Sequence, residues 1–376
     1  MTDINLTSFN ANKMNIRNLI IVILSLIVIT GCMKDDELWE RRLVNHQHFD
    51  GVFVLNEGNM MYENASLTYY DKQLQESFQD VFYHTNALPL GDVAHSMTLR
   101  DSLGYIVLNN SGRIYVINTQ TFEYEGKITG FVSPRFIHFI NDEKAYVTDL
   151  YARKIYIVNP VSLEITGHID VNNHTSGFYQ HPTEQMIQWQ QYVFVNAWSF
   201  DDKVLVIDSE TDMLVDSITV TAQPQSMVMD ENQKLWVLCD GGFAGNPFRY
   251  EEPALLRIDP STREIERKIT FNITHSPRSL ATNAQKNILY FVNKHVYKLP
   301  VNSPLSPQVF VESKYAEGIG GFRGVAIDPV SSEVYITDAK DHVQPGSVYR
   351  FLPDATPVDT FPAGIIPSAI VFKPAE

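Results

Sequence analysis

Short apolar strands that each end in Asn or Asp recur along the chain. They combine β-branched, aromatic and aliphatic residues, as strands do, and no 3.6-residue period competes with this pattern. The repeat occurs seven times, at VFVLN (52–56), YIVLN (105–109), AYVTD (145–149), YVFVN (192–196), LWVLCD (235–240), LYFVN (289–293) and VYITD (334–338). The repeats begin roughly 40–54 residues apart, an interval typical of propeller blades of four strands. The pattern therefore predicts seven blades.

Each repeat continues into further strand-like segments. A second strand ends in a turn signal, as in IYVINTQT, IYIVNPVS, VLVIDSET and LLRIDPST. Short Asn and Asp side chains there can bond the backbone two residues on, so Asx turns are predicted at Asn118, Asn159, Asp208 and Asp259. A third strand follows, such as EYEGKITG or MLVDSITV. A fourth element then opens near Pro or Gly, as in SMTLR, FIHFI, QMIQW, SMVMD, SLATN, GVAID and AIVFK.

The order of these segments predicts how the ring closes. The strand at 52–56 has no fourth element before it, and the last fourth element, Ser368 to Lys373, has no blade of its own. Pairing the two would complete the first blade and leave no long exposed strand edge. The predicted fold is therefore all-β, a seven-bladed propeller of four-stranded blades over residues 50–376.

The N-terminal segment carries signals of export. Leu19 to Ile29 is apolar except for one serine and follows Lys13 and Arg17. It is shorter than the about 20 residues that a bilayer span needs, so it is expected to be a signal-peptide core, with the start at Met1 or Met14 left open. The run ends in Ile-Thr-Gly-Cys, which resembles a bacterial lipobox. A signal peptide is thus expected at 1–31 and a lipidated tether at 32–49, with Cys32 carrying the membrane anchor.

The residues after Cys32 allow two interpretations. Met33-Lys34-Asp35-Asp36-Glu37 is similar to the surface-export signal of Bacteroidota lipoproteins, although a plain solvated tether would look much the same. If Cys32 is lipidated, Cys239 is the one other cysteine. It is then expected to be buried and free of disulfide bonds.

Composition and motifs narrow the function classes. A net charge of -15 argues against nucleic-acid binding, which calls for a basic surface. The sequence has no GxSxG or HExxH motif and its eleven histidines are scattered, so neither enzymatic activity nor a catalytic cofactor is expected. A lyase or lactonase would gather His and Glu around a metal. His95 and Glu184 allow that interpretation, but arginines at equivalent positions would repel a cation.

The fourth elements bring seven residues to one structural address. In a propeller this strand is innermost and begins on the face where the Asn- and Asp-ended strands finish. One residue of each is therefore expected to surround one mouth of the central channel, and we call the set the mouth ring: His95, Arg135, Glu184, Gln225, Arg278, Arg323 and Ser368. A purely structural role remains open, in which the arginines pair with Glu184 or with loop carboxylates.

The loops that follow the Asn- and Asp-ended strands should surround this ring. The longest, DGGFAGNPFRYEEPA (240–254), far exceeds the two to five residues that a hairpin needs. Rings, amides and guanidinium groups on one face suit a large, flat, amphipathic ligand, although single aromatic residues in loops often serve packing. The candidate loop contacts are Asn56, Asn59, Tyr62, Asn110, Tyr151, Trp198, Phe200, Asp240, Phe243, Phe248 and Tyr250.

The span 52–374 resembles the YncE-like seven-bladed propellers of Bacteroidota, and among them the surface cobalamin-binding lipoproteins. The resemblance rests on LGDVAHSM (90–97), GKITGFVSPRFIHF (126–139), NDEKAYVTD (141–149), TEQMIQW (183–189), CDGGFAGNPF (239–248) and GIIPSAI (364–370). It implies a lipid-anchored protein on the outer membrane that binds cobalamin or another corrinoid. It also implies handover to a TonB-dependent transporter without bond chemistry. Capture of another nutrient, or surface adhesion, remains the alternative.

Overall fold

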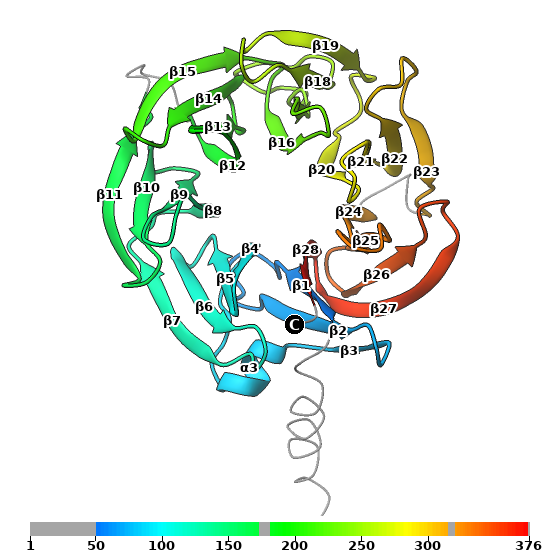
Figure 1. The fold of residues 1–376 in the computed structure, drawn as a ribbon. Helices are drawn as coiled ribbons and strands as arrows, with labels where there is room; N and C mark the ends of the chain where they lie inside the picture. Colours follow the sequence, from blue (N-terminus) through cyan, green and yellow to red (C-terminus); the bar gives the residue numbers. More distant parts are fainter. Residues whose placement is uncertain (1–49, 173–180, 315–319, 375–376) are drawn as a thin grey trace, which may run out of the picture. The chain divides into compact units, whose positions relative to one another are not determined.

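Seven four-stranded antiparallel sheets form a ring in the computed structural model, which describes residues 50–172, 181–314 and 320–374 (Figure 1). The predicted seven-bladed propeller is confirmed. The chain divides into Met1–His46, which lies outside the described residues, and Gln47–Glu376, which contains the propeller. The expected signal peptide (1–31), tether (32–49) and lipidated Cys32 also lie outside the described residues and stay predictions. Within the described ranges, no helix has the length and hydropathy of a membrane span.

Each blade runs from an innermost to an outermost strand. Blade 1 consists of β28 (Pro367–Lys373), β1 (Gly51–Asn56), β2 (Ser66–Asp71) and β3 (Glu76–Phe78). Blade 2 consists of β4 (Ala94–Arg100), β5 (Leu103–Leu108), β6 (Arg113–Asn118) and β7 (Tyr124–Thr129). Blade 3 consists of β8 (Pro134–Phe139), β9 (Ala145–Asp149), β10 (Lys154–Asn159) and β11 (Glu164–Asp170). Blade 4 consists of β12 (Thr183–Trp189), β13 (Tyr192–Ala197), β14 (Lys203–Asp208) and β15 (Met213–Thr219).

The remaining blades repeat this order. Blade 5 consists of β16 (Pro224–Met229), β17 (Leu235–Cys239), β18 (Ala254–Ile258) and β19 (Ile265–Thr270). Blade 6 consists of β20 (Arg278–Thr282), β21 (Ile288–Asn293), β22 (His295–Pro300) and β23 (Gln308–Val311). Blade 7 consists of β24 (Phe322–Ile327), β25 (Val334–Asp338), β26 (Pro345–Phe351) and β27 (Pro357–Ile365). A short helix that the sequence pattern did not predict, α3 (Val81–Asn86), follows β3.

The Asx turns lie where the sequence predicts them. Oδ1 of Asn118 accepts hydrogen bonds from the backbone N–H groups of Gln120 and Thr121, at 2.8 and 3.1 Å. The predicted turns at Asn159, Asp208 and Asp259 have the same arrangement. In each turn, two backbone N–H groups have no partner on a neighbouring strand. The Asn or Asp side chain accepts hydrogen bonds from both, so the chain can reverse direction without leaving these groups unbonded.

The hydrophobic core lies between neighbouring blades. Every residue of β1, β9, β17 and β25 is buried, because both faces of these second strands pack against an adjacent sheet. Trp236, Leu238 and Leu255 of blade 5, for example, form one cluster with Leu280 and Phe291 of blade 6. Burial on both faces explains why these strands are continuously apolar instead of alternating. Cys239 is fully buried and free, as predicted.

The C-terminal strand closes the ring. β28 pairs antiparallel with β1, from Gly51 opposite Lys373 to Leu55 opposite Ala369. This pairing confirms the predicted closure. A second contact fastens the same junction farther out, where the ring of Tyr70 in blade 1 stacks on Phe361 of blade 7 with centroids 4.1 Å apart. Blade 1 is therefore built from both ends of the propeller sequence.

Candidate functional site

The mouth ring occupies equivalent positions in all seven blades. Arg278 is the first residue of its innermost strand, and each of the other six is the second residue of its own strand. In Figure 1 these innermost strands, from β4 to β28, face the centre of the ring. The antiparallel order places their first residues on the face where the second strands end. The fold therefore places the predicted ring residues at equivalent positions on one face of the propeller.

Three members of the ring form a buried charge cluster. Nε of Arg135 lies 2.8 Å from Oε1 of Glu184, and Nε2 of His95 lies 3.5 Å from Oε2 of the same carboxylate. Burial raises the pKa of Glu184, but Arg135 and His95 outweigh it and hold that pKa below its usual value. The pKa of His95 is lowered by burial and by the charge of Arg135. Arg135 thus has the structural pairing that the sequence left open.

A second arginine has a carboxylate partner that the sequence analysis missed. Nη2 of Arg323 donates to both oxygens of Glu57, at 3.0 and 3.3 Å. Glu57 follows directly after β1, so the contact joins the loop of blade 1 to the innermost strand of blade 7. Asn56 belongs to the repeated pattern of strands that end in Asn or Asp. Glu57 lies one residue outside that pattern, so the sequence repeats do not indicate its role.

The third arginine lacks such compensation. The side chain of Arg278 makes no hydrogen bond or ion pair with the described residues. Burial and the nearby charge of Arg323 lower its pKa, while Asp240 and Glu57 act in the opposite direction from beyond ion-pair distance. A guanidinium group that is partly withdrawn from water and lies beside a second cation favours an anionic partner. Arg278 is the strongest candidate ligand contact in the ring.

Other polar atoms of the ring are incompletely bonded. Within the described residues, four buried ring atoms have no hydrogen-bond partner: Nε2 of His95, Nε of Arg135, Oε1 of Glu184 and Oγ of Ser368. Three of these atoms, on His95, Arg135 and Glu184, lie at charge-pair distance within the buried cluster, so these groups attract each other without an aligned N–H. Gln225 differs, because its Oε1 accepts a hydrogen bond from the backbone N–H of Ser279 at 3.0 Å and so joins blades 5 and 6. Ser368 and Arg278 therefore retain the clearest capacity for further hydrogen bonds.

Two loops beside the ring are tied together by Trp198 and Asp240. Nε1 of Trp198 donates to Oδ2 of Asp240 at 2.9 Å, and Nε2 of Gln223 donates to Oδ1 at 3.0 Å. Burial raises the pKa of Asp240, although these bonds oppose the shift. The ring of Phe200 meets that of Phe243 edge to face at 6.1 Å. Asp240 therefore positions the indole of Trp198, which is half-buried.

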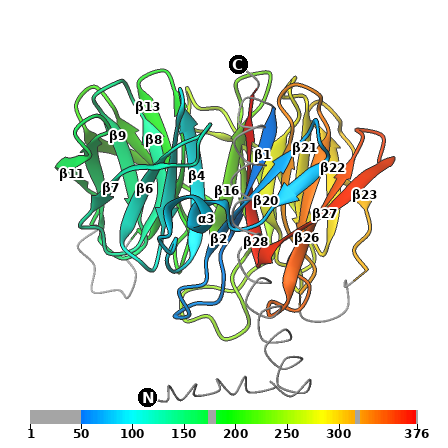
Figure 2. The same ribbon diagram turned by 90° about the horizontal axis from the view of Figure 1, so that it is seen from below.

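Exposed side chains extend from the same face. Tyr62, Tyr151, Phe243, Phe248 and Tyr250 are all exposed, Tyr62 to 77%. The long loop of blade 5 and the loop that carries Tyr62 project from one side of the ring in Figure 2. Met60 and Met61 are also exposed on the latter loop, and the sequence analysis did not select them. Rings and thioethers together give this face the apolar area that a flat ligand requires.

Polar contacts hold the loop that carries Tyr62. Nδ2 of Asn59 donates to the backbone oxygen of His342 at 2.8 Å, which joins the loop to blade 7. The backbone N–H of Met61 donates to Oδ2 of Asp92 at 2.8 Å, and Nδ2 of Asn110 donates to the same oxygen. Asn59 and Asn110 therefore support the loop. Tyr62 is the predicted side chain that it presents.

The structure removes Asn56 from the candidate contacts. Asn56 is fully buried, and its Nδ2 donates to Oγ1 of Thr68 at 3.0 Å and to Oγ of Ser66 at 3.1 Å. Its Oδ1 accepts from the backbone N–H of Gly364 at 2.9 Å. Both polar atoms of the Asn56 side chain are therefore engaged in hydrogen bonds within blade 1 and across its junction with blade 7. The Asn that ends the repeated strand is thus structural in blade 1.

The chemistry of a metal-dependent enzyme was the alternative use of His95 and Glu184. Over the described ranges, no three or more His, Cys, Asp or Glu side chains are grouped to hold a metal ion. Glu184 is engaged with His95 and Arg135 instead. The arrangement is suited to binding a ligand by charge, hydrogen bonds and stacking.

Comparison with known proteins gives a family and a fold. The pattern of the family described as a domain of unknown function (DUF5074) matches residues 50–362. No curated protein matches the chain significantly. A quinonprotein alcohol dehydrogenase-like protein from Bacteroides thetaiotaomicron VPI-5482 is similar in structure, with 15% identity, a TM-score of 0.65, and coverage of 87% of this chain and 78% of that one. The periplasmic gluconolactonase PpgL of Pseudomonas aeruginosa has 10% identity, a TM-score of 0.63, and coverage of 86% and 100%. At these identities the likeness concerns the fold alone.

Proposed function

Since this chain belongs to the DUF5074 family, whose function is unknown, we propose a function from its mouth ring: capture of cobalamin or a related corrinoid. A similar propeller from Bacteroides agrees with the expected Bacteroidota fold, whereas the corrinoid rests on the sequence resemblance and on the site. The protein acts by binding and release, with no bond made or broken. Cobalamin is its ligand and no catalytic cofactor is required.

The uncompensated Arg278 is the observation that carries this proposal. Cobalamin combines a flat macrocycle with peripheral amides and one phosphate group. The mouth offers a matching set, in which Arg278 and Arg323 supply positive charge and the underused atoms of the ring supply hydrogen bonds. Guanidinium groups bind phosphate through fixed, charge-assisted hydrogen bonds. We assign Arg278 to the phosphate because Arg135 and Arg323 already have carboxylate partners.

The aromatic loops supply the remaining affinity. Trp198 is held by its hydrogen bond to Asp240, so its ring loses little freedom when a ligand arrives. Phe200 lies near it in sequence, with its ring edge to face against Phe243. Preorganised rings lower the entropic cost of binding. Tyr62, Phe248 and Tyr250 extend the surface outward and would contact the edge of a ligand larger than the ring itself. Such a site can take a whole corrinoid on the face of the propeller without a deep cavity.

The cellular setting is part of the proposal. A lipid on Cys32 would anchor the protein to the outer membrane, and Lys34 with the following acids would direct it to the cell surface. From there the protein would pass its corrinoid to a TonB-dependent transporter. The apolar side chains Met60, Met61 and Tyr62 project on the mouth face, where a transporter that takes over the ligand must also make contact.

A set of arginine variants tests the site. Arg278→Gln should weaken cyanocobalamin binding by roughly tenfold or more, because a charge-assisted hydrogen bond contributes about 1.5–3 kcal/mol. Its melting temperature without ligand should stay unchanged, because the side chain has no hydrogen-bond or ion-pair partner to lose among the described residues. Arg135→Ala should instead lower the melting temperature by leaving Glu184 unpaired. Arg323→Ala should affect both, and Trp198→Ala should weaken binding through lost stacking.

Cobinamide supplies the control ligand, because it is a corrinoid without the nucleotide loop and its phosphate. The parent protein should bind it more weakly than cyanocobalamin, and Arg278→Gln should bind the two with similar affinity. A variant that keeps the full preference for cyanocobalamin would show that Arg278 does not contact the phosphate. A parent that binds neither corrinoid would contradict the function, and capture of another nutrient or adhesion would take its place.

A further inference from the structure

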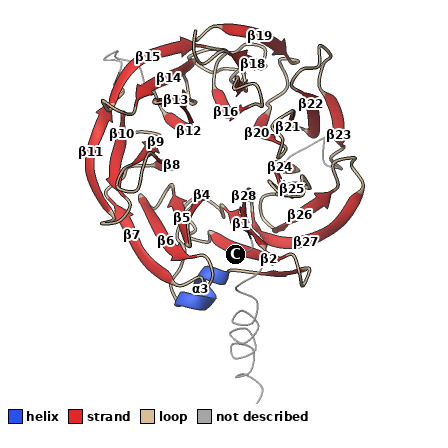
Figure 3. Ribbon diagram, viewed as in Figure 1, coloured by secondary structure: helices blue, strands red, loops and turns tan. Residues whose placement is uncertain are grey.

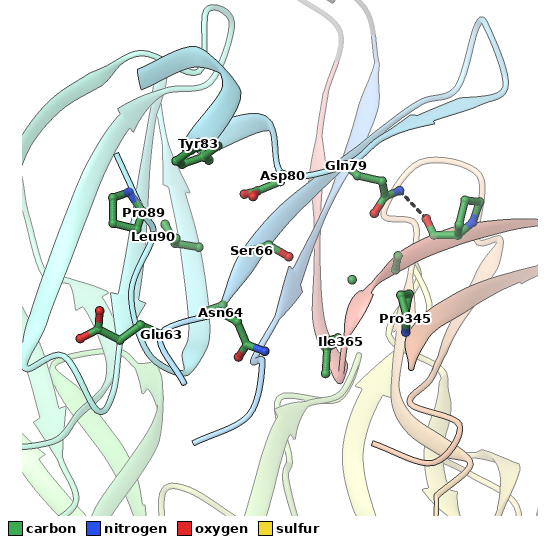
Figure 4. A pocket seen from close by; sticks show the side chains of 14 residues that line it. Glu63, Asn64, Ser66, Gln79, Asp80, Tyr83, Pro89, Leu90, Pro345 and Ile365 are labelled. Atoms are coloured by element: carbon green, nitrogen blue, oxygen red, sulfur yellow. Dashed lines mark hydrogen bonds between the residues drawn. The ribbon is translucent and has the colours of Figure 1, made fainter. Parts of the chain in front are cut away.

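A cavity of about 520 Å³ lies away from the mouth ring, between blades 1 and 7. Its walls come from the start of β2, from the segment on either side of α3, and from the ends of β26 and β27 that face it (Figure 4). We call it the interblade pocket. Sites for small organic molecules occupy roughly 300–1,000 Å³. The pocket is therefore large enough for one such molecule, and neither the resemblance nor the proposed function uses it.

The walls of the interblade pocket are mainly apolar. Tyr83, Pro89 and Leu90 form one side, and Pro345 and Ile365 form the other, as Figure 4 shows. Pro345 and Pro362 restrict the flexibility of the second wall. An occupant with an apolar body would exclude water from both sides.

Most polar groups in the pocket are already bonded. Gln79 donates to the backbone oxygen of Pro362 at 2.9 Å and accepts from Oγ1 of Thr68 at 2.9 Å. Oγ of Ser66 accepts from Asn56 at 3.1 Å, and Oδ1 of Asn64 accepts from the backbone N–H of Asn59 at 2.7 Å. These groups are part of the wall, and they have little hydrogen-bonding capacity left for an occupant.

Asp80 is the exception. Its Oδ1 is buried and has no hydrogen-bond partner within the described residues, and the side chain does not cap α3 although it precedes the helix. Burial raises the pKa of Asp80, and the charge of His84 and the interaction with the backbone N–H of Tyr83 only partly offset this effect. Asp80 lines the pocket. A cation placed beside its carboxylate would offset the free-energy cost of its partial burial.

The charge of the lining decides which donor fits. Its two ionisable carboxylates are Asp80 and Glu63, and no lysine or arginine is among the lining residues. The net charge of the chain, -15, adds a field that attracts cations toward any surface opening. This negative charge disfavours the binding of anionic ligands. A cationic donor gains more binding free energy from it than a neutral donor does.

We propose that the interblade pocket binds a small organic ammonium ion, with its apolar body between the Leu90 and Pro345 walls and its ammonium group on the carboxylate of Asp80. No residue of the mouth ring lines this pocket, although Glu63 and Asn64 of its lining belong to the loop that carries Tyr62. The ammonium site therefore stands or falls apart from corrinoid capture.

The probe is 2-phenylethylamine, which is a cation at neutral pH, and 2-phenylethanol is its neutral counterpart. Isothermal titration of the full chain should show saturable binding of the amine, roughly tenfold or more tighter than the alcohol. Asp80→Asn should abolish this preference by weakening the amine and leaving the alcohol unchanged. Leu90→Trp, which fills the cavity, should weaken both probes.

A matched control is Asp101→Asn. Asp101 has a left-handed backbone conformation close to that of Asp80, with φ of 52° against 51°, but it is exposed in the turn between β4 and β5 of blade 2. Asn tolerates this conformation, so both substitutions should preserve the backbone. Asp101→Asn should leave both affinities at the parent values. Cyanocobalamin binding should be the same in all four proteins.

Three results would overturn the proposal. One is a parent that shows no saturable amine binding, and another is a parent that binds amine and alcohol equally. The third is an Asp80→Asn variant that keeps the amine preference. If Asp80→Asn does not fold, Leu90→Trp decides, and unchanged amine affinity in that variant contradicts the assigned pocket.

Discussion

We expect Arg350 to make the largest polar contribution to the stability of the junction between blades 1 and 7, where the ring closes. This residue is 6% exposed and lies in β26 of blade 7. Its guanidinium group donates to the hydroxyl of Tyr70 in blade 1, to Oδ2 of Asp359 and to Oε2 of Glu333, each at 2.8 Å. The hydroxyl of Tyr70 also donates to Asp359 at 2.6 Å. Replacing Arg350 with methionine keeps the apolar stem and removes the three bonds that the guanidinium group donates.

The expected loss is about 2–3 kcal/mol in the free energy of unfolding. Removing one partner of a fully buried ion pair costs about 3–5 kcal/mol, because the other charge remains uncompensated. The side chains of Glu333 and Asp359 are 19% and 28% exposed, so water screens part of that penalty. The hydroxyl of Tyr70 keeps its bond to Asp359, which limits the loss further.

Arg257 provides the control. It lies opposite Trp236 in blade 5 as Arg350 lies opposite Tyr335 in blade 7, but its Nε pairs only with Glu266 of its own blade, at 3.1 Å. Arg257→Met should cost about 0–1 kcal/mol. Urea titrations followed by circular dichroism would measure both variants and Tyr70→Phe. The reasoning would be refuted if the two arginine variants lost equal free energy of unfolding. It would also be refuted if the effects of Tyr70→Phe and Arg350→Met were additive in the double variant.

Three further predictions concern closure, acid and anchoring. Removing residues 367–376 deletes β28 and should cause aggregation or non-cooperative melting, because β1 then has an unpaired edge. Burial keeps His95 neutral below its ordinary pKa of 6.5, so unfolding takes up a proton and the free energy of unfolding should fall as the pH drops through that value. The loss should be smaller in His95→Gln. Glu184, whose pKa is lowered from 4.5, adds a further loss only below that value. Cys32→Ser should move the protein from the membrane fraction to the soluble fraction, whereas replacing Lys34, Asp35 and Asp36 by Ala should keep the anchor and remove protease accessibility in whole cells.

Each of these predictions has a contrary outcome. A truncated chain that melts like the parent would contradict the closure by β28. An identical fall of stability in His95→Gln would assign the proton uptake to other histidines. A Cys32→Ser protein that stays in the membrane fraction would contradict the lipid anchor, and unchanged accessibility after the triple substitution would contradict the export signal.

The fold was predictable because it repeats. Seven strands that end in Asn or Asp, with Asx turns at fixed positions after them, report local preferences that recur in each blade. The closing strand could be predicted by the same means, since Ser368 to Lys373 has the composition of a fourth element and no blade to join. The helix α3 escaped notice because its six residues are too few for a helical period to appear.

The shared position of the mouth-ring residues was predictable, and their contacts were less so. Equivalent positions in a ring show that Arg135, Arg278 and Arg323 share a mouth, but they do not show which carboxylate each arginine meets. Arg323 pairs with Glu57, which lies 266 residues away in sequence. Asn56 bonds Gly364 across the ring closure. Such contacts depend on the three-dimensional approach of distant loops, and no local pattern encodes them.

The most direct test is a titration of the purified full chain with cyanocobalamin, followed by isothermal calorimetry. The account predicts a saturable complex with one corrinoid for each chain, weakened in Arg278→Gln without a change in the melting temperature of the ligand-free protein. The absence of saturable heat, or a complex that Arg278→Gln binds as tightly as the parent, would contradict the account.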